Sequence, residues 1–397
     1  MARDVLHELV SSGVSHQETL HVIISHFGGA QSTPNHEVDV PRDGPHALRI
    51  RSKGDQIVEI KVGPALDAQD IPQLKKKIHD KLVNSQDSFV AAHVFFSTHP
   101  INGSYRCSDP KVQFLSAPDA APRPPFVAGE HPFVVEFPCT RSSDVMITVK
   151  RRMAQVKLWS HVLNVVLAPR ITPLESRGQW SWVLVDGEPP QEFRFAQHGY
   201  SVPELRNERD DFSPALGRLT ETPHDAYYMS HPPLYGDQFA IPDSLGETLN
   251  RIFSLPKDAS ARFFRAAHWL FTAGATWQDS ASAAFISTIA AFESLIPRPK
   301  PGTPCTECGK DTSPGPTRLF RQFLDTYVPS TEGMRNVADR LYTVRSNLAH
   351  GEYMLLSDVE PFGAFDSEWL REFETRGHLH AVSRIAILNW LYGQEFS

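Results

Sequence analysis

Arg345 and His350 are five residues apart in the segment 345–351, which reads Arg-Ser-Asn-Leu-Ala-His-Gly. A histidine titrates near neutral pH, so it can act as a general base or a general acid. An arginine keeps its proton and offers a planar, two-pronged donor to an anion. These two residue types together can move protons beside a bound anion.

A carboxylate interrupts an apolar row about fifty residues earlier. Ile286, Ile289, Glu293 and Ile296 follow one another at helical spacing. An isolated carboxylate on an apolar face is costly to bury, so Glu293 requires a cation. Arg345 and Arg340 are the candidates, and the simplest interpretation is a structural ion pair at the edge of the core.

The segment Cys305-Thr306-Glu307-Cys308-Gly309 has the spacing of a zinc half-site. A complete structural site needs four ligands, and the chain has no second Cys-x-x-Cys. Cys107, Cys139, a histidine or the same loop of a second subunit can complete it. The alternative is two thiols without a metal. A catalytic zinc is not expected.

Two other patterns carry less weight. Asp55, Glu59 and Lys61 resemble the carboxylates and lysine of magnesium-dependent nucleases. Asp55 is too close to Glu59 for the usual arrangement, and alternating charge is common on the solvent face of a strand. Residues 302–310 do not match a phosphate-binding loop, and His378 and His380 are expected on a solvated surface.

The elements that position these residues are helical in the C-terminal part. Apolar residues recur at helical spacing in 258–274, 279–296, 317–328, 332–349 and 367–392, with a break expected near Gly377. The N-terminal part predicts a hairpin over 47–62, a helix over 71–83, strands at 89–97, 133–137 and 146–149, and a helix over 153–167. The expected fold class is therefore α+β. We predict a mixed α/β domain in 1–170, a proline-rich connecting region in 171–245 and a helical bundle in 246–397.

Composition limits the function classes. The formal charge of −7 argues against a broad basic surface that coats nucleic acid. Residues 300–397 hold 10 Lys and Arg against 13 Asp and Glu, so any contact with RNA must use a few placed cations. No apolar stretch approaches the roughly 20 residues of a membrane span, and no signal peptide is apparent. Four cysteines do not form a disulfide framework, so we expect a cytoplasmic protein.

The segment 345–351 resembles the Arg-x4-His signature of the HEPN family, in the form of its ApeA-like branch, and the resemblance spans about residues 258–392. It implies an RNA-cleaving site, built at a homodimer interface from the Arg and His of both chains, with no catalytic cofactor. His350 would act on the ribose 2′-hydroxyl or the leaving oxygen, and Arg345 would hold the phosphate. Asn347 would orient the imidazole or bind phosphate.

The resemblance extends to other residues. Ala291-Phe292-Glu293-Ser294-Leu295 is similar to a segment whose acidic residue faces the active cleft in HEPN proteins, and ApeA-like members carry similar Cys-x-x-Cys loops. At about 100° per residue, Arg345 and His350 lie about 140° apart on a helix. They therefore act together only if the helix frays at its end or if two chains combine. Tyr353 is one position later than the tyrosine of some HEPN toxins.

The sequence thus favours an endoribonuclease in a defence or toxin-like role, whose N-terminal region recognises an unknown trigger. Two alternatives stay open. The helical domain can be a non-catalytic dimerisation or RNA-binding module, and the chain can be a magnesium-dependent nuclease that uses Glu59 and Lys61.

Overall fold

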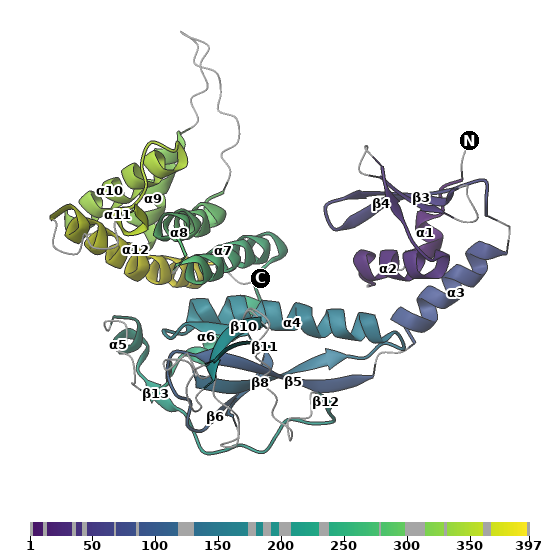
Figure 1. Cartoon of the computed structure of the whole chain (residues 1–397), viewed down its shortest axis with the longest axis horizontal. Helices are drawn as coiled ribbons and strands as arrows, with labels where there is room; N and C mark the ends of the chain where they lie inside the picture. The colour runs from purple at the N-terminus through teal and green to yellow at the C-terminus, as the bar shows by residue number, and fades with distance from the viewer. Residues whose placement is uncertain are drawn as a thin grey trace, which may run out of the picture. The chain divides into compact units, whose positions relative to one another are not determined.

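The protein has an α+β fold in a computed structural model of the whole chain (Figure 1). Sheets and helices mix in the first part, and helices alone form the C-terminal part. The structure describes residues 3–10, 14–33, 37–41, 46–66, 69–84, 87–117, 131–173, 180–185, 192–197, 208–229, 238–277, 279–297, 314–328, 332–359 and 367–394.

The chain forms two compact units, each built from several stretches. The first contains Met1–Ala91, Pro138–Gln155 and Glu208–Asp211, and the second contains Ala92–Phe137, Val156–Asn207 and Phe212–Ser397. Three elements run from one unit into the other, namely the strands Ser88–Ser97 and His131–Thr140 and the helix Val145–Val166. The consecutive parts 1–170, 171–245 and 246–397 that we predicted do not follow this division, because the order of residues along the chain does not reveal where the chain returns to an earlier unit.

The first unit packs short helices against an antiparallel sheet of order β1-β2-β3-β4. Its strands are β1 (Gln31–Ser32), β2 (Glu37–Pro41), β3 (His46–Lys53) and β4 (Gln56–Val62), and its helices are α1 (Leu6–Leu9), α2 (His16–Phe27) and α3 (Asp70–Leu82). The predicted hairpin is confirmed, with Lys53 paired to Gln56 at the turn. The core of the unit is formed by apolar side chains of these elements, including Val22, Ile23, Leu48, Ile50, Ile60, Leu74 and Ile78.

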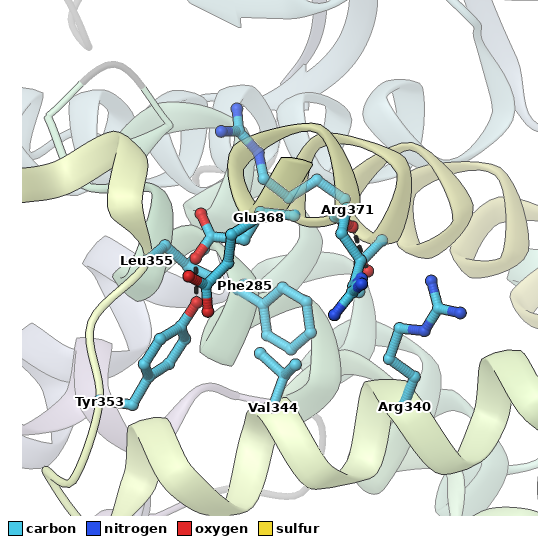
Figure 2. Close-up of a pocket in the computed structure, with 10 residues that line it drawn as sticks. Phe285, Arg340, Val344, Tyr353, Leu355, Glu368 and Arg371 are labelled. Carbon is cyan, nitrogen blue, oxygen red and sulfur yellow. Dashed lines mark hydrogen bonds between the residues drawn. The ribbon is translucent and has the colours of Figure 1, made fainter. Parts of the chain in front are cut away.

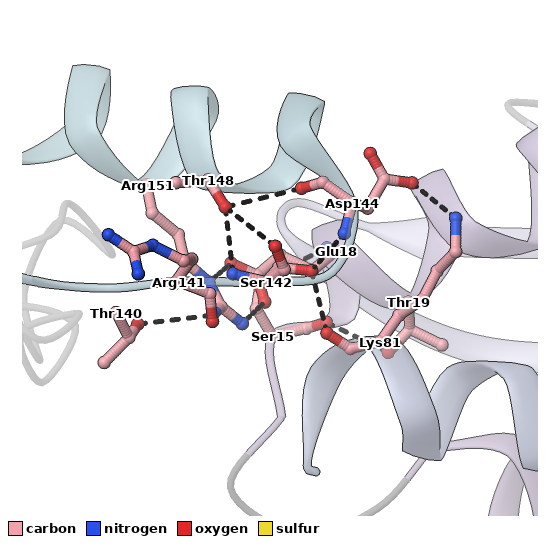
Figure 3. Close-up of polar contacts among 10 residues, drawn as sticks. All are labelled: Ser15, Glu18, Thr19, Lys81, Thr140, Arg141, Ser142, Asp144, Thr148 and Arg151. Carbon is pink, nitrogen blue, oxygen red and sulfur yellow. Dashed lines mark hydrogen bonds and ion pairs between the residues drawn. The ribbon is translucent and has the colours of Figure 1, made fainter. Parts of the chain in front are cut away.

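A polar network holds the start of α4 (Val145–Val166) in the first unit (Figure 3). Asp144 precedes the helix, and its Oδ1 accepts a hydrogen bond from the N–H of Met146 at 3.1 Å. Its Oδ2 lies 2.5 Å from Nζ of Lys81 at the end of α3. Arg151 donates to both carboxylate oxygens of Glu18 in α2, each at 2.7 Å. The network therefore joins α2 and α3 to the first turns of α4.

The second unit combines a sheet with the remaining helices. Strands β5 (Ser88–Ser97), β8 (His131–Thr140), β7 (Lys111–Ser116) and β6 (Ser104–Ser108) are neighbours in that order, and β9 (Ile171–Pro173) pairs with β5. β12 (Glu208–Arg209) belongs to the first unit and pairs there with the start of β5, at Ala91 and Val90. Helix α4 lies along this sheet (Figure 1). Shorter elements are β10 (Trp180–Val185) with β11 (Glu192–Gln197), β13 (Thr220–Thr222) with β14 (Ala240–Pro242), and α5 (His224–Met229).

The C-terminal helices are α6 (Leu245–Phe253), α7 (Lys257–Thr276), α8 (Ala281–Leu295), α9 (Pro316–Tyr327), α10 (Glu332–Ala349), α11 (Leu356–Val359) and α12 (Ser367–Tyr392). The five helices expected from periodicity are confirmed as α7, α8, α9, α10 and α12. Helix α8 packs against α7, α10 and α12. Aromatic and aliphatic side chains fill the space between them, including Phe263, Phe285, Phe292, Phe320, Leu341 and Leu391.

Two sequence predictions are wrong. Residues 146–149 were expected to form a strand because Ile147, Thr148 and Val149 favour strands, but they lie in the first turns of α4. The cap at Asp144 and the burial of Ile147 in the first unit outweigh this local preference. Gly377 was expected to break the last helix, but α12 continues through it. A glycine costs a helix only about 1 kcal/mol, and the flanking Thr375 and Leu379 are buried.

No helix among the described residues is long and apolar enough to cross a membrane.

Candidate active site

The end of α10 is fixed by its own backbone. Gly351 has φ 72°, in the left-handed region where glycine is favoured. Its N–H donates to the carbonyl of Leu348 at 3.2 Å, and the N–H of Glu352 donates to the carbonyl of Asn347 at 3.0 Å. These two bonds form a Schellman motif, which ends a helix without fraying. His350 therefore occupies the C-cap position, and the expected end of the helix at residue 349 is confirmed.

Arg345 pairs with Glu293 across α10 and α8. Nη2 of Arg345 lies 3.1 Å from Oε1 and 3.3 Å from Oε2 of Glu293. The two side chains are 29% and 35% exposed, so the pair lies at the edge of the core and is open to solvent. Cζ of Arg345 also lies 5.9 Å from the ring centre of Tyr342, one turn earlier in α10. The prediction that Glu293 takes its cation from Arg345 or Arg340 is confirmed, with Arg345 as the partner.

His350 is exposed at the helix end. Its N–H donates to the carbonyl of Ser346 at 3.0 Å, so its backbone still follows the helix. Within the ranges that the structure describes, its imidazole forms no hydrogen bond or ion pair, and nothing joins it to Arg345 or Asn347. Asn347 is half-buried, and its carbonyl takes part in the Schellman motif. A single chain therefore holds the Arg and the His of the motif apart, as the helical angle between them predicts.

The segment after α10 is tied to α12 by a buried carboxylate. Tyr353 donates its hydroxyl proton to Glu372, and the N–H of Leu356 donates to Oε2 of Glu372 at 2.8 Å. Burial and the neighbouring Glu372 raise the pKa of Tyr353 above its ordinary value. The sequence carries no signal for this contact, because Tyr353 and Glu372 lie on separate segments that meet only through tertiary packing (Figure 2).

Asp358 caps the helix that carries Glu293. Its two carboxylate oxygens accept from the N–H of Ala281 at 2.6 Å and of Ser282 at 2.9 Å, and from the hydroxyl of Ser280 at 3.1 Å. Burial alone would raise the pKa of Asp358, but these hydrogen bonds hold it below its ordinary value. The carboxylate is therefore charged at the positive end of α8, which stabilises the helix.

Cys305 and Cys308 of the candidate zinc half-site lie outside the described residues. Cys107 and Cys139, considered as further ligands, are buried free thiols. No cluster of three or more His, Cys, Asp or Glu side chains suited to a metal ion occurs in the described part of the chain.

Glu59 and Lys61 lie on β4 in a surface network of charges. Oε2 of Glu59 lies 3.3 Å from Nε of Arg51 on β3 and 3.1 Å from Nζ of Lys61. Asp55 lies in the hairpin turn between these strands. The carboxylate of Glu59 thus pairs with two cations, Arg51 directly across the hairpin and Lys61 two residues further along the same strand.

Comparison with protein-family models, with curated proteins and with solved structures finds no match to this chain.

Proposed function

We propose that the protein is a metal-independent endoribonuclease of the HEPN type that acts as a homodimer. The observation that carries this proposal is the pairing of Arg345 with Glu293, together with a His350 that is exposed at the fixed end of the helix that carries Arg345. The carboxylate directs the guanidinium, and the imidazole is accessible to a substrate. The whole set lies on two packed helices, which hold their side chains more rigidly than loops do.

The proposed reaction is an intramolecular transfer at phosphorus. His350 removes the proton of a ribose 2′-hydroxyl, and the resulting oxygen attacks the adjacent phosphorus atom. The bond from phosphorus to the 5′-oxygen breaks, and that oxygen takes the proton that the imidazolium of His350 then carries, so the neutral imidazole is restored. The products are a 2′,3′-cyclic phosphate and a 5′-hydroxyl. Arg345 binds the phosphate and stabilises the charge that develops on it.

Two chains are needed in this proposal because one chain keeps Arg345 and His350 apart. In a two-fold symmetric dimer, each surface meets its own copy, so Arg345 can work with the partner subunit's His350. Asn347, on the last turn of α10, is proposed to orient the imidazole or bind phosphate.

The cellular role is proposed from the family resemblance. The N-terminal region would sense a trigger and restrain the nuclease, as in defence or toxin-type proteins. We place the protein in the cytoplasm, where free thiols such as Cys107 and Cys139 persist. Cys305 and Cys308 would bind a structural zinc, with no metal in the reaction.

Cleavage of an RNA pool in EDTA, with matched DNA as control, tests the proposal. The expected result is cleavage of RNA alone, with 2′,3′-cyclic phosphate ends. Cleavage that requires magnesium would favour a nuclease based on Glu59 and Lys61, and no cleavage of RNA in either condition would favour a non-catalytic module. The Glu293–Arg345 pair also suits that last alternative, because it bridges two helices of the bundle.

A further inference from the structure

Two neighbouring parallel strands of the second unit are each followed by a residue that can do chemistry. β13 and β14 pair in parallel, with Thr222 opposite Pro242 at their ends. His224 comes two residues after β13, and Ser244 comes two residues after β14. Parallel neighbours bring the segments after their carboxyl ends to one edge, where ligands bind in open α/β sheets. The topology therefore brings together a histidine and a serine that are 20 residues apart in sequence.

A short hydrogen bond joins these two side chains. Oγ of Ser244 lies 2.5 Å from Nδ1 of His224. When Nε2 carries the proton of the neutral imidazole, Nδ1 accepts from the serine hydroxyl. A histidine that accepts from a serine hydroxyl can take its proton as the serine oxygen attacks a substrate. Both residues are half-buried, so solvent and a small molecule can still reach them.

The serine lies on a turn between a strand and a helix. β14 ends at Pro242, and α6 begins at Leu245. In serine hydrolases of the α/β type, the nucleophile occupies such a turn, with a glycine two residues after it. Gly246 has this place here, and a Cβ on it would lie 3.1 Å from the hydroxyl of Tyr105. The close approach of Tyr105 therefore favours glycine at this position.

Ser244 does not cap the helix that it precedes. A serine at this position usually accepts a hydrogen bond from an N–H of the first turn, but its side chain makes no such bond. The N–H groups of Gly246 and Glu247, which a cap would engage, form no hydrogen bond with the residues that the structure describes. The first N–H groups of a helix favour negative charge. These two donors are therefore available to an oxyanion that forms beside Ser244.

Two tyrosines hold the imidazole of His224 in place. Its ring centre lies 4.8 Å from that of Tyr228 and 5.6 Å from that of Tyr392, with both pairs close to edge-on. The hydroxyl of Tyr228 donates to the carbonyl of Val166 at 2.8 Å. The hydroxyl of Tyr392 lies 2.7 Å from Oγ1 of Thr248. Because both tyrosines are anchored, the imidazole keeps its orientation toward the serine.

The charges around the pair are negative. Glu221, Asp225 and Asp243 are exposed and form no ion pair with the described residues. Glu247 is also exposed, but it pairs with Arg251 at 2.9 Å. A surface of one sign repels substrates of the same sign. The site therefore favours a neutral or cationic substrate over an anionic one.

We propose that Ser244 and His224 form an esterase site for a small neutral or cationic carboxylic ester. The geometry supplies a nucleophile, a base and two donors for the oxyanion. The proposal goes beyond the ribonuclease and does not depend on it, because this site uses neither Arg345 nor His350.

The proposed reaction has two steps. Oγ of Ser244 attacks the carbonyl carbon of the ester, and His224 takes the proton of the hydroxyl. The bond from that carbon to the alcohol oxygen breaks, and the alcohol leaves with the proton of the imidazolium. A water molecule then attacks the acyl-serine and gives a proton to the imidazole. The carboxylic acid leaves, and Oγ recovers that proton.

Labelling of the full-length protein with a neutral fluorophosphonate tests the proposal. The phosphorus atom of this probe bonds to an activated serine oxygen, and fluoride leaves. Ser244→Ala removes the nucleophile, and His224→Phe removes the base while it keeps a ring beside the two tyrosines. Ser254→Ala is the matched control, since Ser254 follows the same helix, is exposed, and has its Oγ 3.3 Å from Oδ1 of Asn250.

The expected result is one adduct per chain, mapped to Ser244 by mass spectrometry, in the wild type and in Ser254→Ala. Ser244→Ala and His224→Phe should not be labelled, and each should hydrolyse para-nitrophenyl acetate about 100-fold more slowly than the wild type. The wild type should hydrolyse this neutral ester faster than the anionic para-nitrophenyl monoester of succinate. No adduct on the wild type, an adduct on another residue, or equal labelling of His224→Phe would overturn the proposal.

Discussion

Replacing Glu293 by glutamine separates the two roles that its pairing with Arg345 can have. The substitution keeps the size and hydrogen-bonding shape of the side chain but removes its charge. If the pair only bridges α8 and α10, the change affects stability. If the carboxylate holds Arg345 for a phosphate, the change affects cleavage instead.

The structure sets the expected loss of stability. The side chains are 29% and 35% exposed, and their closest atoms are 3.1 Å apart. Ion pairs this open to solvent contribute about 0.2–1 kcal/mol. For a unit of this size, the melting temperature should then fall by less than about 4 °C.

The expected loss of activity is larger. A displacement of about 1 Å in a substrate-positioning group can cost about 100-fold in rate, so we expect kcat/KM for RNA cleavage to fall about 10- to 100-fold in Glu293→Gln. Arg345→Ala should lose more, because it removes the charge itself. The double variant should be no slower than Arg345→Ala, because Glu293 is proposed to act only through Arg345.

Asp339→Asn is the matched control. Asp339 also lies on α10 and pairs with Arg321 of α9, with Oδ1 and Nε 2.6 Å apart, and both side chains are about half exposed. This variant should cleave RNA as fast as the wild type. The reasoning is refuted if Glu293→Gln cleaves at the wild-type rate, or if its effect simply multiplies with that of Arg345→Ala.

Three further predictions concern stability, each measured by thermal denaturation. Gly351→Ala should cost about 1–2 kcal/mol, because φ is 72° and no neighbouring atom lies within 4 Å of an added Cβ, so the cost is backbone strain alone; an unchanged melting temperature would contradict the Schellman cap. Leu341→Ala should cost about 2–5 kcal/mol, because Leu341 is fully buried, and a loss below about 1 kcal/mol would exclude a packed core there. A hydrogen bond from Lys81 outweighs burial and holds the pKa of Asp144 below its ordinary value. The ionised Asp144 therefore contributes fully to the free energy of unfolding above the pKa of the unfolded chain, about 3.9, and this contribution is lost as the pH falls through the lower pKa of the folded protein. Asp144→Asn should therefore be less stable than the wild type near neutral pH, and the difference should shrink in acid; a constant difference would contradict this linkage.

The C-terminal helices were predictable because their sequence signals agree. Apolar residues recur at helical spacing in five ranges, and five helices, α7, α8, α9, α10 and α12, occupy these ranges. The Glu293–Arg345 pair was predictable for a related reason. A carboxylate in an apolar row must find a cation, and few are available nearby.

Features that depend on tertiary packing were not predictable in the same way. Residues 146–149 carry strand-favouring side chains, and only the cap at Asp144 and the burial of Ile147 make them helical. The contact between Tyr353 and Glu372 was missed because the two residues lie on segments that are separate in sequence. It depends on how the segment after α10 packs against α12, which periodicity does not report.

The central claim is a composite site in which Arg345 of one chain works with the partner subunit's His350. The most direct test is RNA cleavage in EDTA by wild type, Arg345→Ala, His350→Ala and the two variants refolded together. Each variant alone should be about 100-fold slower or worse. The mixture should recover about a quarter of the wild-type rate, because half of its dimers are mixed and each mixed dimer has one complete site. Wild-type rates in both single variants, or a mixture as slow as its components, would contradict the composite site.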